Sequence, residues 1–505
     1  MALLNSVLSW IIKKRIHQIE LFKKYPHEVQ EEWLRKLING AKDTEWGLKY
    51  DFKSIKTYAD FCERVPVNDY DSLKPYIERL RNGEQNLLWP SEIRWFAQSS
   101  GTTNDKSKFI PVSEESLEDC HYKGGKDMLA IYFNNNPESN FFDGRGLALS
   151  GSHRIKEVNN EDYYTGDLSA IIIQNLPFWA EFIRVPKRSV ALMDNWEIKI
   201  EEMAKTSIEY SLTSLSGVPS WTLLLLKRIL EISGKENISE VWPDLEVFFH
   251  GGVNFAPYRK QFLKLIPSPK MHFVETYNAS EGFFGIQDQL DSNELLLMLD
   301  YGIFYEFLPI DQVDSEKKKP LPLDKVKLQT NYAMLISTNA GLWRYMIGDT
   351  IEFTNLSPFR IRITGRTKSF INAVGEEVII DNAETALAEA CLTNQALISE
   401  YTAAPVYADG DKRAAHEWVI EFEILPKNIE DFTNSLDKAL QSLNSDYEAK
   451  RFKDMILDKP ILRMVPKGTF YKWLKKRGKL GGQNKVPRLS NNRIYIDDLL
   501  EDLKF

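Results

Sequence analysis

"AQSSGTTNDKSKFIPVS", residues 97–113, connects two short apolar stretches and is unusually rich in hydroxyl groups and lysines. An ordinary surface turn needs only one or two Gly, Asn or Asp residues. A Walker A loop is excluded, because the second glycine of GxxxxGK[ST] would fall at Lys106. The loop still offers what a polyphosphate needs: hydroxyl donors, a glycine that allows close backbone approach, and positive charge. The residues concerned are Ser99, Ser100, Gly101, Thr102, Thr103, Lys106 and Lys108. A hydrophilic β-hairpin connection is the alternative.

The composition describes a globular chain of more than one domain. With 505 residues, two or three domains are expected. The net charge of −8 disfavours chain-wide binding to nucleic acid or to an anionic membrane. Three widely spaced cysteines argue against a disulfide framework, and the seven histidines show no metal-ligand spacing such as HExxH. No apolar run approaches the roughly 20 residues of a membrane span.

The first 40 residues are predicted to be mainly helical, ending near Asn39 and Gly40. The chain opens with an apolar decapeptide, but its positive charges follow the apolar part, whereas those of a signal peptide precede it. We therefore expect an amphipathic helix packed on the body of the protein, and a cytoplasmic location.

From about Ile93 onward, short β-rich runs alternate with helical stretches. The runs are "IRWFA", "KFIPV", "GLALSG", "SAIII", "LEVFFH" and "KMHFVE". The clearest helix is "PSWTLLLLKRILEISG", with Ser220 as its expected N-cap and Gly234 as its stop. Such alternation predicts a mixed α/β domain with a largely buried sheet.

A second organisation begins after Gly365. "RIRITGRTKSFINAVGEEVIIDNAETALAEACL", residues 360–392, predicts a strand, a turn, a strand and then a helix, with Asp381 and Glu384 as a capping box. A strand "HEWVIEFEILP" and an amphipathic helix at residues 430–451 follow. We predict an α/β fold with a large N-terminal domain, residues 1–365, and a smaller mobile α+β domain, residues 366–505. The hinge would lie near residues 365–368.

Two further stretches place polar side chains near strand ends. "FVETYNASEGFFG", residues 273–285, carries Tyr277, which could stack on a purine, and Glu281, whose carboxylate could hold a divalent cation. "NAGLWRYMIGDTIEF", residues 339–353, places Asp349 where a carboxylate could accept from both hydroxyls of a ribose. A Tyr and a Glu at a strand end are commonplace, and a simple Gly-Asp turn is the alternative for the second stretch.

Taken in order, these motifs resemble those of the adenylate-forming superfamily, and more narrowly those of the auxin-responsive acyl acid–amido synthetase family, here in a bacterial-type member. The family's SSGTSxGxxKxxP loop stands as Ser99 to Pro111, its YxxSEG block as Tyr277 to Gly282, and its AGLYRY…GD block as Ala340 to Asp349. Its C-terminal GTF…QYKTPR element is similar to "GTFYKWLKKRGKLGGQNKVPRL", residues 468–489. General acyl-CoA synthetases usually carry a different lysine motif there.

The resemblance implies an ATP-dependent ligase that uses Mg²⁺. It would make an acyl-adenylate from a small-molecule carboxylic acid, release pyrophosphate, and transfer the acyl group to an amine, expected to be an amino acid, releasing AMP. It assigns catalytic roles to Lys485 and Lys108, phosphate binding to residues 99–108, adenine to Tyr277, ribose to Asp349 and Mg²⁺ to Glu281. Further nucleotide-binding residues would be Gly251, Gly252, Thr276, Ser280 and Arg366, with Arg366 and Lys368 at the hinge. For the glycines a simple turn is the alternative, and for Lys485 a solvated tail.

Two departures from the family pattern keep rival functions open. Asp105 replaces the second glycine of the loop, and Met346 replaces an arginine of the third motif. One rival is an acyl-CoA ligase, which shares the adenylation step but transfers to a thiol; the C-terminal element speaks against it. The other is a nucleotide-binding homologue without catalytic activity.

Overall fold

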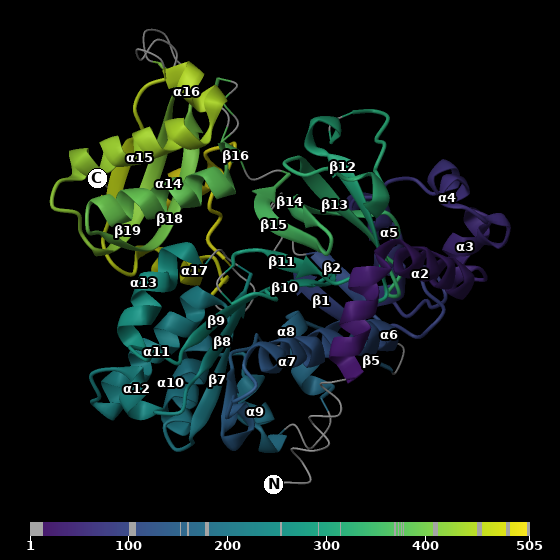
Figure 1. The fold of residues 1–505 in the computed structure, drawn as a ribbon, viewed down its shortest axis with the longest axis horizontal. Coiled ribbons are helices and arrows are strands. Elements are labelled where there is room, and N and C mark those ends of the chain that lie inside the picture. The colour runs from purple at the N-terminus through teal and green to yellow at the C-terminus, as the bar shows by residue number, and fades with distance from the viewer. Residues whose placement is uncertain are drawn as a thin grey trace.

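The fold was obtained as a computed structural model (Figure 1). It describes residues 14–99, 108–151, 153–158, 161–176, 181–252, 255–290, 292–313, 315–367, 370–371, 373–374, 376, 378–407, 413–451, 457–480 and 485–501. In Figure 1 the helices α14 (Ile380–Thr393) and α15 (Ile429–Leu443) and the strands β18 (Leu397–Val406) and β19 (Ala415–Ile424) form a group beside the strands from β12 (Ile303–Pro309) to β15 (Phe359–Arg366).

An eleven-stranded mixed sheet forms the centre of the large N-terminal part. Its order is β12-β13-β14-β15-β11-β10-β9-β8-β7-β3-β6, with β6, β3, β7, β8 and β9 parallel and the remaining neighbours antiparallel. The parallel strands are β3 (Arg145–Ala148), β6 (Arg184–Val185), β7 (Leu212–Gly217), β8 (Val247–Gly251) and β9 (His272–Ala279). The antiparallel strands are β10 (Gly282–Ile286), β11 (Leu295–Leu297), β12 (Ile303–Pro309), β13 (Asn331–Thr338), β14 (Tyr345–Leu356) and β15 (Phe359–Arg366).

The parallel half of the sheet is buried on both faces, which explains the continuous apolar run "LEVFFH". Phe248 packs in the core cluster shared with α10 (Trp196–Ser207), α11 (Pro219–Ser233) and α13 (Ala256–Leu265). Val247 and Phe249 pack on the opposite face against Tyr132 of α7 (Lys123–Asn135). Figure 1 shows these helices on the two sides of β7, β8 and β9. The predicted mixed α/β fold is confirmed.

A separate four-stranded sheet, in the order β2-β1-β5-β4, carries the hydroxyl-rich loop. β1 (Trp95–Ser99) pairs antiparallel with β2 (Lys108–Val112), so the loop is the connection of a hairpin. The other strands are β4 (His153–Val158) and β5 (Glu161–Gly166), and the nearby helices are α6 (Glu114–Ser116), a π-helical turn (Leu117–Tyr122), α8 (Leu168–Gln174) and α9 (Arg188–Ala191). The short helix α12 (Ile238–Val241) packs elsewhere, on α11 (Figure 1).

The C-terminal part is built on a three-stranded sheet in the order β18-β19-β20. β18 (Leu397–Val406) and β19 (Ala415–Ile424) are antiparallel, and β20 (Ile461–Val465) runs parallel to β19. A small pair, β16 (Phe370–Ile371) and β17 (Val378–Ile379), precedes it. The helices are α14 (Ile380–Thr393), α15 (Ile429–Leu443), α16 (Ser445–Arg451), α17 (Thr469–Lys476) and α18 (Ile494–Glu501). β15 is the last strand along the chain that belongs to the large sheet, and it ends at Arg366. The predicted domain boundary at residues 365–366 falls at the same place, and it stays a prediction.

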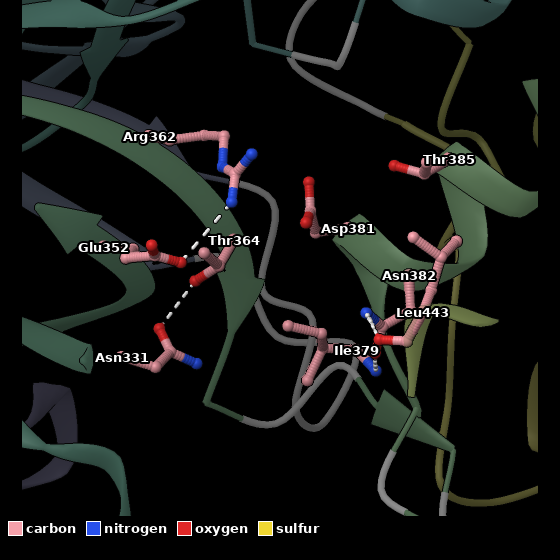
Figure 2. A pocket seen from close by; sticks show the side chains of 9 residues that line it. All are labelled: Asn331, Glu352, Arg362, Thr364, Ile379, Asp381, Asn382, Thr385 and Leu443. Atoms are coloured by element: carbon pink, nitrogen blue, oxygen red, sulfur yellow. Dashed lines mark hydrogen bonds and ion pairs between the residues drawn. The ribbon is translucent and has the colours of Figure 1, made fainter. Parts of the chain in front are cut away.

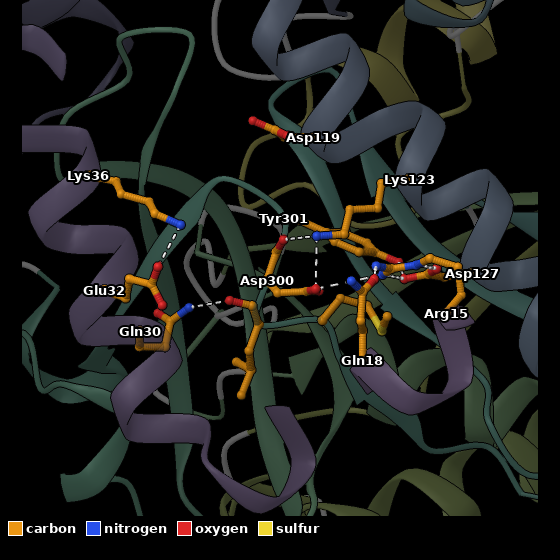
Figure 3. Close-up of polar contacts among 12 residues, drawn as sticks. Arg15, Gln18, Gln30, Glu32, Lys36, Asp119, Lys123, Asp127, Asp300 and Tyr301 are labelled. Carbon is orange, nitrogen blue, oxygen red and sulfur yellow. Dashed lines mark hydrogen bonds and ion pairs between the residues drawn. The ribbon is translucent and has the colours of Figure 1, made fainter. Parts of the chain in front are cut away.

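The N-terminal helices pack on the body of the protein from residue 14 onward, with Ile19 and Phe22 in the large core cluster, whereas the apolar decapeptide at residues 1–10 lies outside the described residues. These helices are residues 14–24, α2 (Pro26–Ala41), α3 (Glu45–Lys49), α4 (Tyr58–Arg64) and α5 (Tyr70–Arg81). Arg15 anchors the first of them by donating to both carboxylate oxygens of Asp127 on α7, at 2.5 Å each (Figure 3). The hydroxyl of Tyr301 donates to the same carboxylate at 2.9 Å, and Lys123 pairs with Asp300 at 2.8 Å. Among the described helices, none is long and apolar enough to cross a membrane.

One predicted element is wrong. "SAIII" is part of the helix α8 and not a strand, because a short apolar run does not by itself separate the two conformations. The predicted helix stop near Asn39 and Gly40 agrees with the structure, in which α2 ends at Ala41.

The predicted helix caps also need correction. Val218 is the N-cap of α11 and Pro219 its first residue, so Ser220 lies inside the helix, whereas Gly234 ends it in the left-handed conformation as predicted. At α14 the side chain of Asn382 accepts the backbone N–H of Ile379 at 3.4 Å. Asp381 and Glu384 therefore form no capping box.

Candidate active site

The ends of β8 and β9 bring two predicted glycines against the predicted threonine. Gly251 pairs with Thr276, whose hydroxyl donates to the carbonyl of His250 at 3.1 Å. A Cβ atom on Gly251 would lie 2.4 Å from the carbonyl oxygen of Thr276. Gly252 has a φ of +81°, a conformation that side chains other than glycine's rarely adopt. Gly251 is thus required by the close approach of the Thr276 backbone, and Gly252 by its positive φ.

Tyr277, Asp349 and Arg366 form one hydrogen-bonded cluster, although the sequence separates them by up to 89 positions. The Tyr277 hydroxyl donates to Oδ2 of Asp349 at 2.9 Å, and Nε of Arg366 donates to Oδ1 at 2.7 Å. Asp349 and Arg366 are cross-strand neighbours on β14 and β15. Burial and the adjacent Asp349 carboxylate raise the pKa of Tyr277 well above its usual value, so its hydroxyl remains a donor.

Lys485 reaches this cluster from the C-terminal part. Its Nζ donates to the carbonyl of Gly252. Burial and the nearby Arg366 guanidinium lower the pKa of Lys485 to about 8, opposed by Asp349. A lysine near the ends of β8 and β14 is poised to meet a negatively charged ligand, whose charge would favour the protonated amine.

The segment after Lys485 is fixed to β18, which explains how that lysine is presented. The hydroxyl of Thr402 donates to the carbonyl of Pro487 at 2.6 Å, and the N–H of Ala403 donates to the carbonyl of Arg488 at 2.9 Å. The Arg488 side chain donates to Glu400 of β18 and to the hydroxyl of Tyr258 on α13. It therefore links the C-terminal part to the large part directly beside the candidate site.

Glu281 lies in the turn between β9 and β10, next to the buried Ser280. Burial raises the pKa of Glu281 while the charge of Lys108 lowers it, which places the two side chains in the same electrostatic environment. A divalent cation would offset the cost of the buried carboxylate. No group of three or more His, Cys, Asp or Glu that could hold a metal occurs within the described ranges. One carboxylate completed by phosphate oxygens and water is the ordinary Mg²⁺ arrangement, and it fits the residues present.

Several predicted residues are placed only in part. The backbone of Ser99 pairs with Lys108 in the β1–β2 register. Ser100, Gly101, Thr102, Thr103, Lys106 and Lys368, together with Asp105 and Gln483, lie outside the described residues. Met346 pairs with Leu335 of β13 and packs beside a small apolar cluster.

Sequence reasoning missed two carboxyl groups close to the site. Burial, helped by the charge of Glu384 on α14, raises the pKa of Glu275 to about 7. Glu275 lies two residues before Tyr277 on β9, so both point to the same face of the strand. A second missed residue is Glu421, which accepts the backbone N–H groups of Gly468 at 2.9 Å and Phe470 at 3.2 Å. Glu421 therefore holds the "GTF" turn at the start of α17. The sequence signal that could have found it is a charged residue within the apolar run of β19.

Comparison with known structures identifies the class of fold. A GH3.15 acyl acid amido synthetase superposes with a TM-score of 0.79 at 16% identity, covering 96% of this chain and 95% of that one. A 2-hydroxyisobutyryl-CoA ligase in its postadenylation state gives a TM-score of 0.61 at 12% identity, covering 94% and 91%. The fold is that of the adenylate-forming enzymes.

Sequence comparison identifies the family. The GH3 family N-terminal domain matches residues 15–271, the central domain residues 296–366 and the C-terminal domain residues 381–494. The chain belongs to the GH3 family, as its motifs predict. Indole-3-acetic acid-amido synthetase GH3.3 of Arabidopsis thaliana is 24% identical, over 94% of this chain and 91% of the relative. Indole-3-acetic acid-amido synthetase GH3.8 of Oryza sativa subsp. indica is 24% identical, over 91% of this chain and 87% of the relative. The chain is accordingly a ligase that activates a carboxylic acid as an acyl-adenylate and then forms an amide.

Proposed function

We propose that the cluster of Tyr277, Asp349, Arg366 and Lys485 binds ATP and carries the adenylation step. The observation that supports this most directly is the convergence of an aromatic ring, a carboxylate and two cations where β8, β9 and β15 end beside Asp349 of β14. In this proposal Asp349 accepts from the ribose hydroxyls, Tyr277 lies against adenine, and Gly251 and Gly252 form the wall of the adenine site. Residues 99–108 surround the phosphates.

The adenylation step needs positive charge where the phosphates react. A carboxylate oxygen of the acid attacks the α-phosphorus, and the bond from that phosphorus to the pyrophosphate oxygen breaks. Negative charge moves onto the leaving pyrophosphate, and Lys485 and Lys108 stabilise it there. Mg²⁺, held by Glu281, would supply further charge neutralisation when bound.

In the second step the amine nitrogen attacks the carbonyl carbon, AMP leaves, and the nitrogen loses a proton. We propose that the amine is an amino acid, and that the acid is a small organic carboxylic acid. The named relatives act on indole-3-acetic acid, which is one candidate among such acids. Reorientation of residues 366–505 about a hinge at residues 365–368 would serve the two half-reactions with one site.

The direct test is pyrophosphate release across a library of carboxylic acids, followed by mass spectrometry with a mixture of amino acids and with CoA. We expect acid-dependent pyrophosphate release and an amide product. A thioester formed in preference to any amide would instead establish the acyl-CoA ligase. Nucleotide binding without acid-dependent pyrophosphate release would establish the non-catalytic homologue.

Asp349→Asn is expected to weaken ATP binding about tenfold to hundredfold, because a hydrogen bond to a charged group contributes about 1.5–3 kcal/mol. The measurement is the ATP dissociation constant, determined with ATP and with its 2′- and 3′-deoxy forms. The wild type should discriminate against the deoxy forms and Asp349→Asn should not. Asp324→Asn, at an exposed position, serves as the control. Equal discrimination in both enzymes would remove Asp349 from the ribose site.

A further inference from the structure

The large sheet meets its neighbours at two junctions that are built differently. At the junction with the C-terminal part, a cavity of about 350 Å³ separates the antiparallel strands from α14 (Figure 2). Arg362 of β15 contacts Glu352 of its own sheet at 3.4 Å, and Figure 2 shows Asp381 of α14 standing apart from that pair. At the junction with the four-stranded sheet, in contrast, the polar groups are tied together by a buried lysine.

This lysine is Lys199 of α10, whose exposed fraction is 0%. Its Nζ donates to the carbonyl of Ser150 at 2.5 Å, to that of Gly151 at 2.9 Å and to that of Ala191 at the end of α9. The hydroxyl of Ser150 donates to the carbonyl of Ala191 as well, at 2.8 Å. An ammonium group has three donors, and here each of them meets one backbone oxygen.

The positive charge of Lys199 is what holds the three carbonyls together. Burial lowers its pKa to about 8, while the charges of Asp167 and Asp194 raise it. The amine is therefore protonated at neutral pH, and all three of its N–H groups are available. A neutral side chain in its place would leave buried carbonyl oxygens without their donor, which is costly.

Two of these carbonyls belong to the connection between the large sheet and the four-stranded sheet. Ser150 and Gly151 follow β3 of the large sheet, and β4 of the four-stranded sheet comes next along the chain. The N–H of Leu149 donates to the carbonyl of Ser216 on β7 at 3.0 Å, which fixes the start of the connection to the parallel strands. Lys199 therefore acts where the chain leaves the large sheet.

Gly151 is fixed to the other sheet at the same time. Its N–H donates to the hydroxyl oxygen of Ser169 on α8 at 3.0 Å, and a Cβ atom on it would lie 1.7 Å from Oδ2 of Asp167. Asp167 follows β5, where Gly166 lies opposite Ala97 of β1. Because β1 and β2 carry the two ends of the hydroxyl-rich loop, the position of Gly151 is transmitted to those ends within a few residues.

We propose that Lys199 is a positioning residue for adenylation, which holds the strands of the hydroxyl-rich loop in register with the nucleoside-binding cluster of the large sheet. The proposal rests on the function proposed above, in which residues 99–108 surround the phosphates while Tyr277 and Asp349 hold the nucleoside. The two halves of ATP would then bind to two different sheets, and the ammonium of Lys199 would fix one sheet relative to the other.

The test compares a ligand that needs both sheets with one that needs only the large sheet. In Lys199→Met, a neutral side chain of nearly the same length, the dissociation constant of ATP should rise about tenfold, the equivalent of roughly one phosphate hydrogen bond. The dissociation constant of adenosine should stay unchanged. Both are measured by calorimetry on one preparation of the full chain, so that a lower folded fraction does not alter either constant.

The rate of the first half-reaction provides a second readout. In Lys199→Met, kcat for acid-dependent ATP–pyrophosphate exchange should fall about tenfold to hundredfold, because a displacement of about 1 Å can cost that much. Lys205→Met is the matched control, since Lys205 lies on the same helix with a side chain that is 53% exposed. Its two dissociation constants and its exchange rate should equal those of the wild type.

If Lys199→Met does not fold, Lys199→Gln takes its place with the same two ligands, because its amide can still donate to two of the three carbonyls. An unchanged ratio of ATP affinity to adenosine affinity in the variant overturns the positioning role and leaves the proposed function standing. Equal weakening of both ligands overturns it too, because the distortion would then not be confined to the phosphates. A wild type that binds ATP no more tightly than adenosine would contradict both the proposed function and the role of Lys199.

Discussion

Lys485→Ala is expected to lower kcat/KM for acid-dependent ATP–pyrophosphate exchange by about 10²–10³-fold, the usual loss when a donor to a developing charge is removed. Lys485 reaches the carbonyl of Gly252 beside the Asp349–Arg366 pair, so its amine lies where the proposed nucleotide would be. Its role in the proposal is to stabilise charge on the phosphates. The loss should therefore appear in the first half-reaction, before any amine is added.

The protonation of Lys485 gives this prediction a second readout. Burial and Arg366 lower its pKa to about 8 in the free protein. The charged form is the active one, so kcat/KM for ATP should decline as pH rises through about 8. In Lys485→Arg the decline should disappear from this range, because a guanidinium stays charged.

Lys472→Ala, a lysine change on the exposed side of α17, provides the control. Its exchange rate and pH profile should match those of the wild type. An unchanged rate in Lys485→Ala would remove Lys485 from the adenylation step. A persistent decline near pH 8 in Lys485→Arg would assign the titration to another group.

The sequence predicts the strands of the large sheet well where burial on both faces leaves a continuous apolar run. "LEVFFH" and "KMHFVE" are both strands of the parallel half. "SAIII" has the same local composition and forms α8 instead. Tertiary packing decides the conformation of this segment, because Ile171 of α8 is buried in the large core cluster. Local pattern does not contain that information.

The site shows the same division between local and long-range information. The residue types of Asp349 and Glu281 suit their proposed ligands, and the sequence alone suggests both. The sequence predicts Arg366 at the hinge and among the nucleotide-binding residues, but only the structure shows its pairing with Asp349 across β14 and β15. That register depends on a β-bulge between Thr350 and Ile351, which no sequence motif predicts. The position of Lys485 likewise depends on how residues 487–490 lie along β18.

Replacing Arg344, within the "AGLWRY" motif, is expected to lower the stability of the protein strongly, because of the contacts that its side chain makes. Its guanidinium donates to both carboxylate oxygens of Glu306, at 2.8 and 2.9 Å, and to the carbonyl of Val65 at 2.7 Å. The two charged side chains are 4% and 1% exposed. Arg344→Met would leave the Glu306 carboxylate buried without its cation, which costs about 3–5 kcal/mol of unfolding free energy.

A double variant separates the loss of the pair from the burden of an unpaired charge. In Arg344→Met/Glu306→Leu both charges are removed, so most of the lost stability should return. Tyr58, which donates to Glu306 at 2.8 Å, can still donate to the carbonyl of Pro320 at 3.2 Å. Urea unfolding followed by tryptophan fluorescence measures each free energy, with Arg413→Met as the exposed control. A loss below about 1 kcal/mol in Arg344→Met, typical of an exposed ion pair, would show that Glu306 does not depend on Arg344 for its burial.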